Sequence, residues 1–258
     1  MRIDIVTIFP EAFTPLSLSI VGRARERGLL EVRVWDLRDF TADRHRQVDD
    51  TPYGGGPGMV MKPEPFFAAI EAITAAAGGR PRILLPTPQG RTLTQEILRD
   101  LSGESRLAIL CGHYEGIDER VSAGLRVEEI SIGDYVVSGG ELPAMVIVDG
   151  VSRLLPGVVG DEQSVAADSF SGGLLDYPHY TRPPEIAGLR VPEVLLSGHH
   201  GAIRRWRRRE QLRRTRRRRP DLWQRAELSA EDRRLLAEEE IPPGEDGEGG
   251  QSAGGGLL

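Results

Sequence analysis

Three glycine-containing loops that follow apolar, strand-like segments hold the residues best suited to binding a small ligand. They are 85–91 (LPTPQGR), 111–120 (CGHYEGIDER) and 131–141 (SIGDYVVSGGE). Glycine lets a backbone approach a ligand closely, and ligands of open α/β sheets collect beyond the carboxyl ends of the strands. A tight turn explains each loop on its own equally well, but the three together favour one shared site for a flat ligand.

These loops lack the features of a phosphate-binding site. The chain contains no G-x-x-x-x-G-K-[ST] motif and no G-x-G-x-x-G after its first strand, and Lys62 is its only lysine. A ligand held mainly by backbone amides and carbonyls therefore fits better than a clamped phosphate. S-adenosylmethionine is a ligand of this kind, because it combines an adenine, a ribose and a sulfonium without any phosphate.

A second chemical feature is the concentration of positive charge at residues 204–219. This segment contains eleven arginines and one acid, Glu210, although the whole chain has a formal net charge of −6. Such asymmetry indicates a surface for a polyanion such as RNA or DNA. The alternative is a solvated helix whose charge is offset by the acidic stretch 227–240.

Alternating strand-like and helix-like segments place the three loops in the first part of the chain. Strands separated by helices predict an α/β domain with a largely parallel sheet. A capping-box pattern at 92–95 (TLTQ) opens one of the helices. The expected strands are 3–9, 32–35, 82–85, 107–111 and 127–132, and further helices are expected at 65–77 and 142–154.

The chain changes character after Pro156, where strand-like segments give way to a short polar stretch and then to helical patterns. One basic helix is expected over 197–219 and ends before Pro220, and residues 229–232 (SAED) should cap a last short helix. The predicted organisation is a first domain at 1–156, a flexible linker or lid at 157–168, a small, mainly helical domain at 169–241 and a disordered tail at 242–258.

Composition narrows the class of protein. Hydrophobic residues make up 39% of the chain and charged residues 28%, as in globular proteins with a real core. The longest apolar stretches are strand-sized, so no membrane association is expected, and the amino terminus lacks a signal-like apolar segment. Cys111 is the only cysteine and cannot form an internal disulfide. These features predict a cytoplasmic protein.

Five motifs, in order along the chain, resemble those of the TrmD family of bacterial tRNA (guanine-N1)-methyltransferases. They are 51–59 (TPYGGGPGM), 111–120, 131–143 (SIGDYVVSGGELP), 168–170 (DSF) and 174–183 (LLDYPHYTRP). The resemblance implies a SPOUT-type parallel sheet with a deep trefoil knot and a homodimer with active sites at the subunit interface. It also implies methyl transfer from S-adenosylmethionine to N1 of guanosine 37, next to the anticodon of tRNA.

The resemblance assigns roles to particular residues. Asp168 is expected to act as the general base at guanine N1, Arg153 to stabilise charge on O6, and Glu115 to contact the base. Tyr53, Gly54 and Gly58 are expected near the site. The implied contacts to S-adenosylmethionine are Leu85, Pro86, Thr87, Pro88, Gly112, Gly116, Ser131, Ile132, Gly133, Asp134, Tyr135, Val136, Val137, Gly139, Gly140 and Pro143.

The substrate and metal follow from the same resemblance. The arginines of 204–219 are expected to hold the phosphates of the anticodon arm while the target base is unstacked into the pocket. Family members depend on Mg²⁺, but no carboxylate cluster in the sequence marks a metal site.

Several alternatives stay open on the sequence alone. Asp168 is also a suitable helix N-cap, Arg153 is placed to interact with a helix dipole, and Arg120 could simply pair with Asp118 or Glu115. The role of His113 is undetermined, because many family members have arginine there. Competing functions are a SPOUT methyltransferase for another RNA atom and an RNA adaptor that binds a nucleotide without catalysis.

Overall fold

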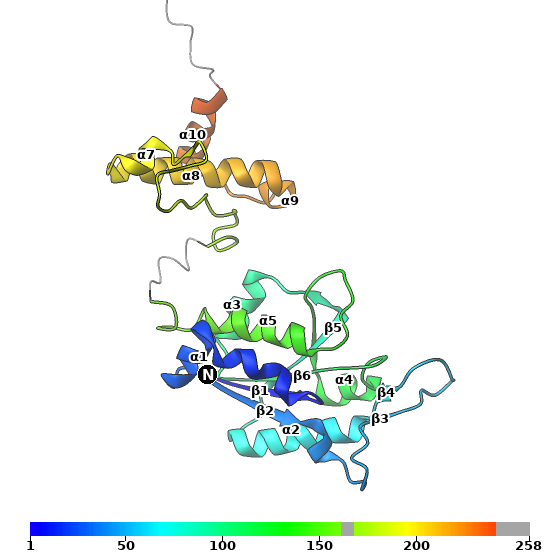
Figure 1. The fold of residues 1–258 in the computed structure, drawn as a ribbon. Coiled ribbons are helices and arrows are strands. Elements are labelled where there is room, and N and C mark those ends of the chain that lie inside the picture. The colour runs from blue at the N-terminus through cyan, green and yellow to red at the C-terminus, as the bar shows by residue number, and fades with distance from the viewer. Residues whose placement is uncertain (161–167, 241–258) are drawn as a thin grey trace, which may run out of the picture. The chain divides into compact units, whose positions relative to one another are not determined.

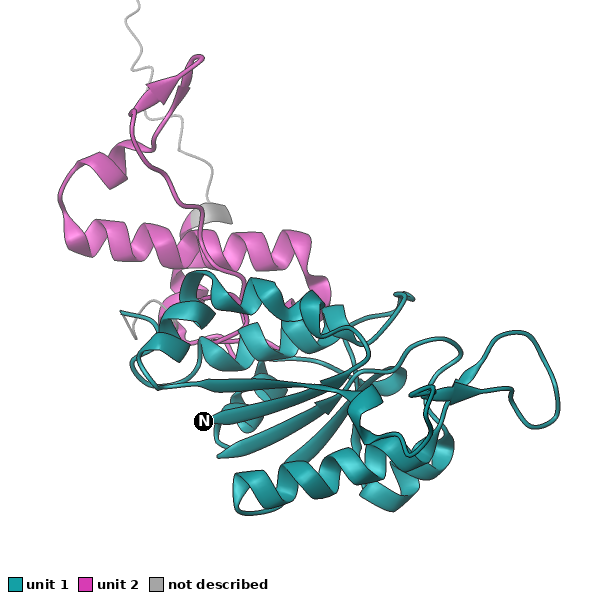
Figure 2. Ribbon diagram, turned by 60° about the horizontal axis from the view of Figure 1, so that its bottom comes forward, with its two compact units in different colours: residues 1–165 teal, residues 166–258 magenta. Residues whose placement is uncertain are grey.

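The computed structural model describes residues 1–160 and 168–240. The chain divides into two compact units, Met1–Val165 and Ala166–Leu258 (Figure 2). The predicted tail at 242–258 and most of the predicted linker at 157–168 lie outside the described residues.

A five-stranded sheet with the order β2-β1-β6-β5-β7 forms the centre of the first unit (Figure 1). Every neighbouring pair in this sheet is parallel, which confirms the predicted α/β class with a parallel sheet. The strands are β1 (Arg2–Thr7), β2 (Glu31–Asp36), β5 (Arg82–Thr92), β6 (Arg106–Leu110) and β7 (Glu128–Ser131).

Helices cover both faces of the sheet because the buried strands are apolar on both sides. Ile3 and Ile5 of β1 face one core, whereas Val6 faces the other. The first core is completed by η1 (Pro10–Ser17), α1 (Ser19–Glu26), α3 (Gln95–Ser102) and α5 (Glu141–Ser152), and the second by η2 (Leu37–Phe40), α2 (Pro63–Ala77) and α4 (Glu119–Leu125) (Figure 1). A short antiparallel pair, β3 (Asp49–Asp50) and β4 (Val60–Met61), flanks the glycine-rich segment.

The capping box expected at 92–95 is shifted in the structure. Thr92 still belongs to β5 and pairs with Ser131, so it cannot cap a helix. Thr94 is the N-cap of α3 instead, and its hydroxyl accepts a hydrogen bond from the backbone N–H of Ile97 at 3.3 Å. The helices α1 and α4 were not anticipated from the sequence.

The second unit contains α7 (Glu193–Leu196), α8 (His200–Arg218), α9 (Pro220–Trp223), α10 (Ala230–Glu240) and a hairpin of β8 (Glu185–Ile186) and β9 (Leu189–Arg190). Leu174, Leu212 and Leu235 form its buried core. Nowhere in the ranges 1–160 and 168–240 does a helix have the length and apolar character to span a membrane.

The expected single helix over 197–219 is wrong at its start. The chain breaks at Gly198, which has φ +71°, and His199 caps α8 by accepting a hydrogen bond at Nδ1 from the N–H of Ala202. The predicted cap of the last helix is confirmed. Ser229 and Asp232 exchange side-chain-to-backbone hydrogen bonds of 3.1 and 2.9 Å, the reciprocal pattern of a capping box.

Candidate active site

The first loop of the site is an excursion within β5. Pro86 pairs with Ile130 of β7, and the pairing resumes with Arg91 opposite the same Ile130. Residues 87–90 are therefore looped out of the strand while β5 continues beyond them. This places the segment Thr87–Gln89 beside a cavity at the carboxyl end of the sheet.

The other two loops meet each other directly. The chain leaves β7 and reaches the end of β6, where the N–H of Gly140 donates to the carbonyl of Gly112 at 2.8 Å. A Cβ atom on Gly140 would lie 2.7 Å from the Cα of Cys111, which is a severe clash. The close approach of these two backbones therefore requires glycine at position 140.

The three loops enclose one cavity of about 350 Å³, within the range typical of small-molecule sites. All of the predicted cofactor contacts line it except Asp134, which is exposed on the third loop. Glu115 also lines the cavity. The lining residues that were not predicted as cofactor or base contacts are Gln89, His113, Tyr114, Ile117, Glu119, Ser122, Glu129, Ile130 and Ser138.

The charge of this lining suits a neutral or cationic ligand. Glu115, Glu119 and Glu129 border the cavity, and no arginine or lysine of the described ranges does. The hydroxyl of Ser122 donates to Glu129 at 3.0 Å, so one carboxylate is partly satisfied within the wall. A sulfonium is tolerated by such carboxylates, whereas a phosphate would be repelled. Ser122 lies outside the three predicted loops, on α4, a helix that the sequence analysis did not anticipate.

The glycine-rich motif at 51–59 is joined to the second loop. The N–H of Glu115 donates to the carbonyl of Met59 at 3.0 Å, and the N–H of Met61 donates to Gly116 at 2.9 Å. Gly58 has φ +81°, and a Cβ there would lie 2.6 Å from Cγ of Glu115. Tyr53, at the start of the motif, is 99% exposed.

Asp118 and Arg120 form a paired unit outside the cavity. Arg120 donates to both carboxylate oxygens of Asp118, at 2.8 and 2.7 Å, and its backbone N–H donates to the same carboxylate at the start of α4. Hydrogen bonding from Arg120 lowers the pKa of Asp118. The expectation that Arg120 pairs with a neighbouring carboxylate is thus confirmed, and the partner is Asp118.

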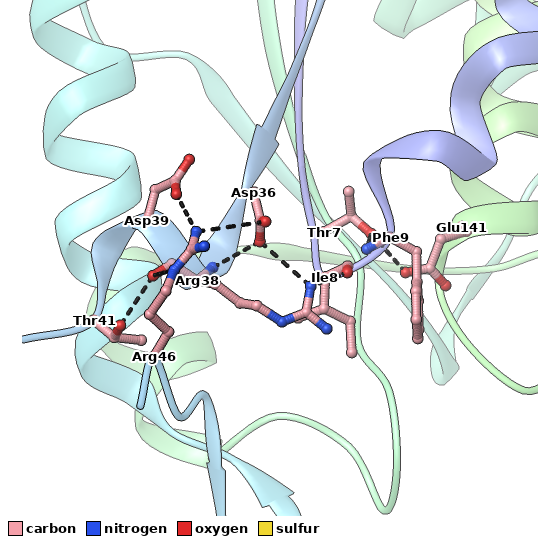
Figure 3. Close-up of polar contacts among 9 residues, drawn as sticks. All are labelled: Thr7, Ile8, Phe9, Asp36, Arg38, Asp39, Thr41, Arg46 and Glu141. Atoms are coloured by element: carbon pink, nitrogen blue, oxygen red, sulfur yellow. Dashed lines mark hydrogen bonds and ion pairs between the residues drawn. The ribbon is translucent and has the colours of Figure 1, made fainter. Parts of the chain in front are cut away.

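His113 lies in the wall between the cavity and the end of β1. Its Nδ1 atom is buried and has no hydrogen-bond partner among the described residues. The same atom lies 4.0 Å from Oε2 of Glu141. The other oxygen of Glu141 accepts from Thr7 at 2.8 Å, which links α5 to β1 (Figure 3). Arg38 donates to the carbonyl of Ile8, so side chains hold this strand end from two directions (Figure 3).

Cys111 is the first residue of the second loop and does not line the cavity. It is fully buried, and burial, followed by the nearby carboxylate of Glu141, raises the pKa of its thiol well above the ordinary value. The nucleophilic thiolate form is therefore disfavoured.

The candidate base and the candidate O6 stabiliser lie in different units. Arg153 is the half-buried C-cap residue of α5 in the first unit. Asp168 is half-buried in the second unit, where its carbonyl accepts from the N–H of Ser171 and residues 169–172 form a turn. Because a turn and not a helix follows Asp168, this residue does not act as a helix N-cap. A meeting of Arg153 and Asp168 in one site stays a prediction.

The basic segment is partly neutralised within its own unit. Arg208 makes two hydrogen bonds to Asp232, of 2.6 and 2.9 Å, and Arg205 pairs with Glu238 at 3.2 Å. The acidic helix α10 therefore does offset some of the charge. Among residues 168–240, in contrast, Arg214 and Arg218 have no acidic partner, and they leave positive charge available on α8.

Comparison with known proteins identifies the family. Residues 1–225 match the family described as tRNA (Guanine-1)-methyltransferase TrmD. The chain belongs to this family. It is 57% identical over 240 residues to the tRNA (guanine-N(1)-)-methyltransferase of Pelotomaculum thermopropionicum, and the match covers 92% of this chain and 96% of that protein. The protein of the same name from Brevibacillus brevis is 55% identical over 239 residues, which cover 92% of this chain and 98% of the relative.

The TrmD relationship does not reveal a metal site. Within the ranges that the structure describes, no group of three or more His, Cys, Asp or Glu residues is arranged to hold an ion.

Proposed function

We propose that this protein transfers a methyl group from S-adenosylmethionine to N1 of guanosine 37 of tRNA. The observation that carries the proposal is the cavity of the first unit, lined by every implied cofactor contact except Asp134. Membership of the TrmD family supports the class of reaction. A cytoplasmic location follows from this substrate and is part of the proposal.

The chain's own contribution to cofactor binding is a set of closely packed backbones. Gly112 and Gly140 bring the second and third loops together, and the looped-out residues 87–90 close the third side. When bound, S-adenosylmethionine supplies an electrophilic methyl group on its sulfonium. The carboxylates of Glu115 and Glu129 at the lining suit that positive charge, since opposite charges attract more strongly in a partly desolvated site.

Guanine N1 must lose its proton before it can accept a methyl group. We assign the proton to the carboxylate of Asp168, and the charge that develops on O6 to the guanidinium of Arg153. Glu115 contacts the base from the mouth of the cavity. The assignment of Asp168 comes from its place in the motif 168–170 (DSF).

The path of the chain supports two further parts of the proposal. The segment 132–140 passes from β7 at the sheet edge to the end of β6, although β5 lies between those strands. A crossing past the looped-out residues 87–90 is what a SPOUT trefoil knot would require. We also propose a homodimer in which each active site is completed by the partner subunit, with tRNA held by the arginines of α8.

Methyl transfer to defined RNA tests the proposal. Pure protein is incubated with methyl-labelled S-adenosylmethionine and unmodified tRNA transcripts that carry G or A at position 37. Label should enter only the G37 transcript. Label in neither transcript would favour a non-catalytic adaptor, and equal label in both would favour a methyltransferase for another RNA atom.

A glycine variant tests the cavity separately. Gly140→Ala should abolish S-adenosylmethionine binding in calorimetric titration, because its Cβ would clash with Cys111. Gly103→Ala is the matched control, since Gly103 ends α3, has an ordinary φ of −76° and lies outside the cavity. Unchanged affinity in the Gly140 variant would contradict the assignment of the cavity.

A further inference from the structure

The second unit contains a groove of its own, with a volume of about 810 Å³. It lies between an extended segment and two helices, and none of its lining belongs to the cavity of the first unit. The lining residues are 177–184 (YPHYTRPP), Val191, Leu195 and Leu196 of α7, and Ile203 and Arg207 of α8.

Aromatic rings and the guanidinium groups of Arg182 and Arg207 dominate the polar part of this groove. The guanidinium carbon of Arg207 lies 4.8 Å from the ring centroid of Tyr177, and the rings of Tyr177 and His179 are 4.7 Å apart. Nε2 of His179 is 2.8 Å from a carboxylate oxygen of Asp176. Tyr180 is 49% exposed, so a large part of its ring is available to a ligand.

Positive charge continues from the groove along one side of α8. Arg207, Arg214 and Arg218 follow Ile203 at helical spacings of four, seven and four residues, which places all of them on the same face. The cations that α10 neutralises, Arg205 and Arg208, belong to another face. One carboxylate, Glu210, lies at helical spacing from Arg207 and Arg214, and its ion pair is with Arg213. The groove therefore opens beside a row in which three cations outnumber one acid.

We propose that this groove binds an unpaired nucleobase of the RNA, with the neighbouring phosphates held by Arg207, Arg214 and Arg218. Recognition of single-stranded RNA combines stacking of bases on aromatic or guanidinium planes with a cationic track for the backbone. The planes for stacking a base are those of Tyr177, Tyr180 and Arg207. The cationic track for the RNA backbone is the row of arginines on α8. The cationic row distinguishes this occupant from an apolar segment of a second copy of the chain. The inference rests on the proposed function only in taking tRNA as the RNA.

Photocrosslinking of the full-length protein tests the groove directly. A tRNA transcript with 4-thiouridine in place of uridine is bound to wild-type protein and irradiated, and the crosslinked peptides are mapped by mass spectrometry. The proposal predicts crosslinks within residues 177–184. Crosslinks confined to other peptides overturn it.

Variants of Tyr180 separate stacking from charge. Tyr180→Ala should weaken tRNA binding about tenfold without changing the salt dependence, whereas Tyr180→Trp should keep the affinity. Arg207→Ala should reduce the slope of log Kd against log salt by about one. The control pair is Ile186→Ala and Leu189→Ala, two exposed apolar residues of the hairpin outside the groove. Equal affinity of wild type and Tyr180→Ala overturns the proposal.

Two measurements keep the result interpretable. Thermal unfolding shows whether each variant is folded. If Tyr180→Ala does not fold, the crosslinks on the wild-type protein decide whether the groove binds RNA. Sedimentation shows whether Tyr180→Ala dissociates the protein; dissociation without loss of RNA affinity would assign the groove to a second copy and overturn the proposal. Failure of the proposed function is seen separately, as a wild-type protein that does not methylate the G37 transcript.

Discussion

The side chain of Glu115 lies directly over Gly58, so that a Cβ atom on Gly58 would be 2.6 Å from Cγ of Glu115. The motif at 51–59 and the second cavity loop are far apart in the sequence, yet this contact and the hydrogen bond from Glu115 to Met59 join them. The glycine thus affects the position of Glu115, whose carboxylate is expected to contact the target base.

Gly58→Ala should lower kcat/KM for tRNA about tenfold or more, because it displaces Glu115 and strains a backbone at φ +81°. Gly55→Ala is a matched control. Gly55 also has a positive φ, +74°, but a Cβ there meets nothing within 4 Å. Equal losses in both variants would show that backbone strain alone, and not the position of Glu115, matters.

Asp168→Asn should bind S-adenosylmethionine normally but lower the rate of methyl transfer at least about a hundredfold, since an amide cannot take the N1 proton. Single-turnover kinetics with saturating cofactor measures the chemical step, and calorimetric titration measures binding. A variant that transfers methyl groups at a near wild-type rate would remove Asp168 as the base.

The arginines of α8 should differ in their contribution to RNA binding according to their partners. Replacing both Arg214 and Arg218 by Ala should reduce the slope of log Kd against log salt by about two, because both cations lack an acidic partner among the described residues. Arg205→Ala should change the slope less, because Glu238 already offsets its charge. Filter binding between low and physiological salt measures the slopes. Identical slopes for the wild type, the double variant and Arg205→Ala would show that the RNA does not bind at α8.

Asp232 should make the second unit acid-sensitive. Hydrogen bonding from Arg208, with further hydrogen bonds from Ser229, lowers the pKa of Asp232 to about 2. A depressed folded-state pKa stabilises the fold above the unfolded value near 4, and the contribution is lost as the pH falls from about 4 to about 2. Asp232→Asn should therefore cost about 2 kcal/mol at neutral pH and nothing below about pH 2.

Calorimetric unfolding against pH checks this expectation. Asp221→Asn serves as the comparison, because Asp221 is also paired with an arginine, Arg219, but is exposed, so solvent screens the interaction. The Asp221 variant should lose less stability. A gap between wild type and Asp232→Asn that persists at pH 2 would contradict the titration argument.

The sequence predicted the sheet and the cavity because both depend on local patterns that agree with each other. Apolar runs such as 107–111 form buried strands, and the glycine loops after them must lie at one edge of a parallel sheet. The exception is Asp134, which is exposed on the third loop. It was predicted as a cofactor contact because it belongs to the motif 131–143, but only its neighbours, such as Gly133 and Tyr135, line the cavity.

Local signals failed where two neighbouring residues were equally suitable. Thr92 and Thr94 are both good caps, and only the pairing of Thr92 with Ser131 decides that α3 begins after Thr94. Gly198 similarly divides an otherwise uniform helical pattern. Such choices depend on tertiary contacts that the sequence does not display.

The second unit shows the same limit for charge. The eleven arginines of 204–219 were visible as a basic segment, but not which of them α10 would neutralise. The groove beside Tyr177 and Arg207 arises from a segment and two helices brought together by folding, so composition could reveal its parts but not their assembly.

The identity of the methylated nucleoside tests the central claim most directly. Unmodified tRNA with G at position 37 is incubated with the protein and S-adenosylmethionine, digested to nucleosides, and analysed by liquid chromatography with mass spectrometry. We predict N1-methylguanosine in the wild-type product and its loss with Asp168→Asn. A different methylated nucleoside, or none, would contradict the proposed reaction.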